Sequence, residues 1–68
     1  TTMTHEELAV IGLTEKDIPN IKPDRIRRMI AWVDGRLKVW SLPKQDVAEL
    51  KQERKILLRL LAEIEQNG

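Results

Sequence analysis

The stretch PDRIRRMIAWVDGRLKVWSLPKQDVAELKQERKILLRLLAEI, residues 23–64, contains two runs with the apolar spacing of an α-helix. In each run apolar residues recur every three or four positions, which places them on one helical face, except that Arg54 occupies one apolar position of the second run. That face carries Ile26, Ile30, Val33, Leu37 and Trp40 in the first run, and Val47, Leu50, Leu57, Leu61 and Ile64 in the second. We therefore expect one helix from Pro23 to about Trp40 and another from Pro43 to the final Asn67-Gly68.

The break between the two helices is short. It consists of Ser41-Leu42-Pro43, and proline is favoured at the first position of a new helix. Two helices joined by so few residues are expected to form an antiparallel hairpin. Because Trp40 falls on the apolar face of the first run, it is expected to belong to the core. Gly35 weakens the same helix by about 1 kcal/mol relative to Ala.

The residues before the hairpin predict shorter helical pieces. Thr4 and Glu7 have the spacing of a capping box, and Gly12 suits a left-handed helix end, so a helix is expected over residues 5–11. Thr14 and Asp17 repeat the cap spacing and predict one turn over residues 15–18, ended by Pro19. The expected fold is all-α, with a short N-terminal helix followed by an antiparallel helical hairpin in one domain, residues 1–68.

A chain of 68 residues is close to the lower size limit for a self-sufficient core. It has no cysteine, which excludes disulfides and the common structural zinc sites and leaves good packing or a second copy as the means of stabilisation. One hairpin cannot cover both wide apolar faces. The short N-terminal helix can cover some of this surface and a second copy more, so we expect a homodimer. Its expected interface is formed by Val47, Leu50, Leu57, Leu61 and Ile64.

No catalytic signature is present. The only histidine, His5, stands at a helix start without a second histidine, and glycine occurs only at positions 12, 35 and 68, so there is no phosphate-binding loop. We expect no enzyme activity, no metal site and no cofactor. No run reaches the roughly 18 apolar residues of a membrane span, and the N-terminus lacks signal-peptide order. A cytoplasmic protein without membrane contact is expected.

The charge distribution is uneven. Residues 22–40 carry six basic and two acidic side chains, and they also contain both tryptophans, the only aromatic residues of the chain. Next to the apolar face of this helix lies a second face formed by Arg25, Arg28, Met29, Trp32, Arg36 and Val39. Tryptophan and arginine are enriched in the residues that dominate protein interfaces. This face is therefore a candidate partner-binding surface, unless both tryptophans fill the core under arginine stems.

A basic helix is also compatible with DNA binding. Recognition helices usually present Asn, Gln, Ser or Thr to base edges, whereas the outward residues here are Arg27, Arg28, Asp34 and Lys38. Base readout is not expected, but sequence-independent contact with phosphates stays open. The alternative function is thus a small DNA-binding transcriptional regulator. A third interpretation is an oligomerisation module cut from a longer protein.

The chain also resembles known proteins. GLTEKDIPNIKPDRIRRMI, residues 12–30, is similar in its turn to the closing half of a SAM domain, without the upstream helices. A second resemblance rests on the stretches THEELAVIGL and WVDGRLKVW, on the length of the chain and on its Leu-rich end. In these features the whole chain resembles the small anti-quorum-sensing proteins of Mu-like temperate phages that infect Pseudomonas. That resemblance implies a non-enzymatic helical homodimer in the host cytoplasm. It would inhibit a LuxR-type quorum-sensing activator and the type IV pilus assembly ATPase, which would give superinfection exclusion.

Overall fold

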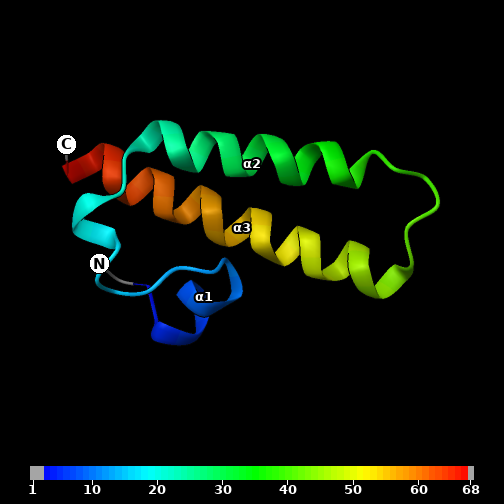
Figure 1. Ribbon diagram of the computed structural model, residues 1–68, viewed down its shortest axis with the longest axis horizontal. Helices are drawn as coiled ribbons and strands as arrows, with labels where there is room; N and C mark the ends of the chain where they lie inside the picture. Colours follow the sequence, from blue (N-terminus) through cyan, green and yellow to red (C-terminus); the bar gives the residue numbers. More distant parts are fainter. Residues whose placement is uncertain (1–2, 68) are drawn as a thin grey trace.

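The computed structural model describes residues 3–67, and the side chains of residues 3–66. Within that part of the chain it is all-helical and contains no strand. The elements are α1 (His5–Val10), a short 3-10 helix η1 (Ile18–Asn20), α2 (Pro23–Leu37) and α3 (Lys44–Asn67). Helices α2 and α3 run antiparallel, side by side, and α1 packs against α3 (Figure 1). The predicted fold class and hairpin are confirmed, while the homodimer stays a prediction.

The capping box predicted at the start of α1 is present. The Thr4 hydroxyl oxygen accepts a hydrogen bond from the Glu7 backbone N–H at 3.1 Å, and the Thr4 backbone N–H donates to Glu7 Oε1 at 3.1 Å. Each residue thus satisfies a backbone donor that the first turn leaves without a helical partner. Gly12 has a φ of 75°, the left-handed conformation that ends helices, and α1 stops at Val10, one residue before the predicted end.

Glu7 also ties α1 to the hairpin, because Arg59 of α3 donates to Glu7 Oε2 at 2.7 Å. The hydrogen bond from the Thr4 backbone N–H lowers the pKa of the Glu7 carboxyl below its ordinary value. The Thr4 side chain and the Arg59 charge act in the same direction, against desolvation of the carboxyl. Folding therefore favours the ionised form of this side chain.

This lowered pKa predicts a pH-dependent stability. A carboxyl whose pKa falls on folding contributes stability above its unfolded pKa and loses it as the pH falls through the folded pKa. Glu7→Gln keeps a side chain that can complete the capping box but removes the charge. We expect the wild-type protein to have the larger free energy of unfolding at neutral pH. The difference should shrink as the pH falls through the lowered pKa of Glu7. Urea unfolding at several pH values measures it, and a difference independent of pH would contradict the assignment.

The segment between α1 and α2 differs from its prediction. Asp17 Oδ2 accepts hydrogen bonds from the Thr14 backbone N–H at 3.0 Å and from the Thr14 hydroxyl at 3.1 Å, so the predicted cap pairing exists. The expectation that Pro19 ends this turn is wrong, because Pro19 lies inside η1, which extends to Asn20. Proline is tolerated in the first turn of a helix, where its missing N–H would have no helical partner.

Helix α2 ends at Leu37, three residues before the predicted end, and α3 begins at Lys44. The Lys38 N–H bonds to the Gly35 carbonyl and the Val39 N–H to the Arg36 carbonyl, so the last turn tightens to three-residue spacing. The chain then leaves the helical path before Trp40, whose side chain is 96% exposed. The prediction that Trp40 belongs to the core is wrong, since helical spacing applies only as far as the helix continues.

The exposure of Trp40 gives a direct test. Trp40→Ala removes no packed contact, so it should change the free energy of unfolding by less than about 0.5 kcal/mol, as surface substitutions usually do. Thermal and urea unfolding followed by circular dichroism measure this change. A loss of several kcal/mol would place the indole in the core after all.

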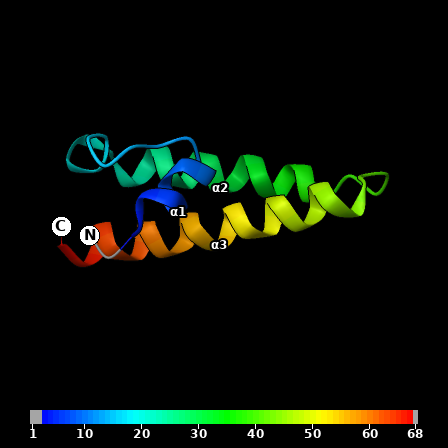
Figure 2. The same cartoon turned by 90° about the horizontal axis from the view of Figure 1, so that it is seen from below.

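The core draws on all three α-helices and on the segment between α1 and α2. Its buried side chains are Met3, Leu8, Ile11, Leu13, Ile21, Ile26, Val33, Leu50, Ile56, Leu57 and Leu60. The first five come from α1 and the chain on either side of it, and Figure 2 shows α1 in front of the two long helices. The N-terminal third of the chain therefore covers part of the apolar surface that the hairpin would otherwise expose.

Two ion pairs join the long helices. Arg54 of α3, which interrupts the apolar spacing, donates to Asp34 of α2 at 2.6 Å, and Arg27 of α2 donates to Glu65 of α3 at 2.7 Å. Because all four side chains are substantially exposed, each pair contributes at most about 1 kcal/mol. Their main consequence is geometric. One pair lies near the start of α2 and the other near its end, so together they favour a single antiparallel register of the two helices.

Candidate partner-binding groove

A groove with a volume of about 320 Å³ lies where α1, α2 and α3 meet. Val10 and Ile11, at the end of α1, form one part of its wall, and α2 and α3 supply the rest. The lining residues are Val10, Ile11, Arg25, Arg28, Met29, Trp32, Val33, Glu53 and Leu57. The groove thus joins three segments that are far apart in the sequence.

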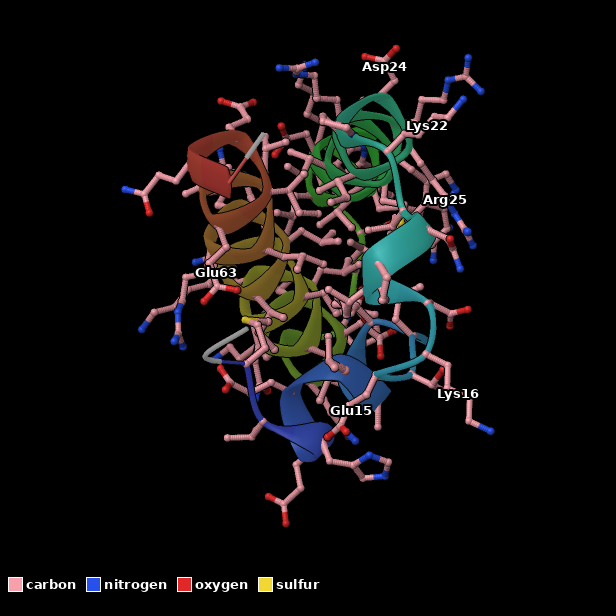
Figure 3. The ribbon with its side chains drawn as sticks, turned by 90° about the vertical axis from the view of Figure 1, so that its left-hand side faces the viewer. Glu15, Lys16, Lys22, Asp24, Arg25 and Glu63 are labelled. Carbon is pink, nitrogen blue, oxygen red and sulfur yellow. The ribbon has the colours of Figure 1, made fainter. Side chains whose placement is uncertain are left out.

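Helical spacing explains the contribution of α2. Arg25, Arg28, Met29 and Trp32 follow one another at three or one positions, so they share the face beside Ile26 and Val33, which are buried. Figure 3, which looks along the hairpin from the end where α2 starts, shows Arg25 on the outer side of α2, away from α3. The face has apolar side chains toward the core and guanidinium groups toward solvent.

Trp32 is the largest side chain of the groove and is 62% exposed. The guanidinium carbon of Arg36, one turn later, lies 5.6 Å from the centroid of the indole ring, within the range of a cation–π interaction. The Arg36 contact thus leaves most of the Trp32 side chain open to solvent. This answers for Trp32 the question that the sequence left open, namely whether both tryptophans fill the core.

The arginines of α2 differ in their partners. Arg27 forms ion pairs with both Asp24 and Glu65. Arg25, Arg28 and Arg36 make no ion pair with any carboxylate of the part of the chain that the structure describes. Three cationic groups therefore border the groove without an ion pair to a described carboxylate. Glu53 of α3 lies in the lining with them and brings one negative charge.

The structure brings together most of the predicted partner-binding set. Arg25, Arg28, Met29 and Trp32 line the groove, and Arg36 stacks beside it. Val39 does not join them, because it follows the end of α2 and is exposed in the connecting loop.

Sequence reasoning did not assign five lining residues to this site. These are Val10, Ile11, Val33, Glu53 and Leu57. Val33 was recognised only as a member of an apolar face, and Leu57 was assigned to the expected dimer interface. Nothing in the local spacing showed that the end of α1 would lie beside α2.

The residues predicted for a dimer interface divide into two groups. Leu50 and Leu57 are buried within the single chain, so their contacts are with other parts of the same core. Val47, Leu61 and Ile64 are only partly buried. Leu58 is exposed on α3 and lines another hollow of about 510 Å³ together with Asp34, Leu37, Lys51, Arg54 and Lys55.

Within residues 3–67, no helix has the length and apolar character needed to cross a membrane. The same residues include no group of three or more His, Asp or Glu side chains placed to hold a metal ion. No protein-family model, curated protein or solved structure matches the chain.

Proposed function

We propose that this chain is a non-enzymatic inhibitor that binds other proteins through the groove beside Trp32. The observation that carries the proposal is the combination of a largely exposed indole with the arginines Arg25, Arg28 and Arg36, none of which has an ion-pair partner among the described residues. Large aromatic rings and guanidinium groups at the centre of a contact supply most of the binding energy of typical interfaces.

The groove favours a protein over DNA as the partner. Its inner surface is apolar, formed by side chains such as Met29, Val33 and Leu57, whereas a phosphate backbone offers little apolar surface. Glu53 also lies in the lining, where it would repel phosphates that approach the arginines. The DNA-binding regulator therefore stays the second candidate, supported only by the basic charge of α2.

The resemblance to anti-quorum-sensing phage proteins supplies the proposed partners. They are a LuxR-type transcription activator and, in addition, the type IV pilus assembly ATPase of the bacterial host. Occupation of a surface on the activator would block its action, and occupation of the ATPase would suppress pilus-dependent superinfection. The proposed active form is a homodimer in the host cytoplasm, and partly exposed apolar side chains such as Val47 and Leu61 are available to it.

The test is a titration of the purified chain with each purified host protein and, separately, with duplex DNA at several salt concentrations. We expect saturable binding to the activator that persists at moderate salt. A DNA-binding protein with six phosphate contacts would instead lose roughly 10³-fold in affinity between 50 and 200 mM salt. Such a steep loss, with no binding to either host protein, would contradict the proposal. Sedimentation of the chain alone measures its molecular mass in solution and so tests the proposed dimer.

A further inference from the structure

The hairpin offers a third helix position that α1 fills only in part. Helix α3 has 24 residues and α1 has six, which correspond to about 36 Å and about 9 Å of helix at a rise of 1.5 Å per residue. Gly12, with its φ of 75°, turns the chain away directly after α1. The groove therefore begins at Val10 and Ile11, at the point where α1 stops.

The open part of this position has the composition of a helix-binding groove. Val33 and Leu57 are almost fully buried at its base, and Met29 and Trp32 extend the apolar surface along α2. An amphipathic helix binds such a surface with apolar side chains at positions i, i+3, i+4 and i+7.

The two sides of the groove carry opposite charges. Arg25 and Arg28 lie on the α2 side, with Arg36 beside Trp32, whereas Glu53 lies on the α3 side. None of the three arginines forms an ion pair with a described residue. A guanidinium group binds a carboxylate through two parallel hydrogen bonds, which makes such a pair both strong and directional.

We infer that the groove binds an amphipathic α-helix of the partner protein that carries carboxylates along one flank. The apolar stripe of that helix lies on Val33, Leu57 and Met29, and its Asp or Glu side chains face Arg25 and Arg28. A helix with carboxylates on the other flank is disfavoured, because they would face Glu53. This inference rests on the proposed function and specifies the chemistry of the partner.

The experiment uses the Trp40→Phe variant, in which Trp32 is the only tryptophan and its fluorescence reports directly on the groove. The probes are two helical peptides of about 15 residues, long enough for partial helicity in water. Both have leucines at helical spacing; one has glutamates along one flank, and the other has lysines at the same positions. We expect the glutamate peptide to shift the Trp32 emission to shorter wavelength and to bind about tenfold more tightly than the lysine peptide.

Charge reversal makes the test specific. The double variant Arg25→Glu with Arg28→Glu should bind the lysine peptide more tightly than the glutamate peptide. Because both side chains are exposed, the two substitutions should not disturb the core. The matched control, Lys51→Glu with Lys55→Glu, changes the net charge equally on α3 outside the groove and should keep the original preference. Equal affinity of the two peptides, no binding of either, or an unchanged preference after reversal at Arg25 and Arg28 would overturn the inference.

Two further outcomes separate this inference from the proposed function and from other occupants. If the host activator binds and the glutamate peptide does not, the inference fails and the proposed function stands. If the glutamate peptide binds and neither host protein does, the proposed partners fail and the groove chemistry stands. If the Arg25 and Arg28 reversal dissociates a dimer, the groove belongs to a second copy of this chain and the inference is overturned.

Discussion

Leu60→Ala is expected to remove about 2–5 kcal/mol from the free energy of unfolding, the range observed when a buried leucine leaves a cavity. Leu60 is 0% exposed and lies on the side of α3 that faces the core. Domains are often stable by only about 5–15 kcal/mol, and one this small is expected near the lower end. A loss at the upper end of this range should therefore leave the chain largely unfolded at physiological temperature, and a smaller loss should lower its melting temperature clearly.

Leu58→Ala is the matched control, because it is the same substitution in the same helix, two residues away. Leu58 is 40% exposed, so its replacement should change stability by less than about 1 kcal/mol. Urea unfolding followed by the helical circular-dichroism signal compares the two variants. Equal losses for Leu58→Ala and Leu60→Ala would mean that the observed side of α3 does not form the core, or that a second copy buries Leu58.

Trp32→Ala is expected to weaken binding to the partner protein by at least about 2 kcal/mol, or roughly 30-fold, the effect typical of a dominant interface residue. Arg28→Glu should have a comparable effect because it places a negative charge where the groove attracts carboxylates. The helical signal should survive both changes, since neither side chain is buried. Isothermal titration with the purified activator, beside circular dichroism of each variant, measures binding and fold separately.

A charge-matched control exists within the same helix. Arg27→Glu changes the net charge as Arg28→Glu does, but Arg27 faces Asp24 and Glu65 and not the groove. It should destabilise the fold slightly and leave partner binding nearly unchanged. If Arg27→Glu weakens binding as strongly as Arg28→Glu, the partner responds to the overall charge of the chain, as a polyanion such as DNA would. Loss of the fold in Trp32→Ala would reassign the indole to the core.

Much of the fold is predictable from local patterns, and the reason is physical. Apolar residues at three- and four-residue spacing identify a helix because the α-helix has 3.6 residues per turn. The Thr4–Glu7 capping box depends only on residues three positions apart, and both predicted hydrogen bonds are present. Pro23 begins α2 as expected, and the short break before Lys44 leaves antiparallel packing as the natural arrangement.

The errors occur where a local pattern continues past the end of its element. Trp40 keeps the spacing of the preceding apolar residues, but α2 ends at Leu37 and the connecting loop carries the indole into solvent. Leu50 and Leu57 were predicted for contacts with a second copy. In the structure they are buried within one chain, as members of its own core. Spacing along one helix cannot show which neighbour covers its apolar face.

The sequence by itself determined the helical class, the hairpin and the face of α2 on which Arg25, Arg28 and Trp32 lie together, because these depend on contacts within a few residues. Only the tertiary structure decided that this face borders a groove and that Val10 and Glu53 complete it. It also decided that, among the described residues, Arg25 and Arg28 form no ion pair while Arg27 forms two. Those features depend on how distant segments pack. Packing follows the area buried by all three helices at once and is not encoded in the spacing along any single one.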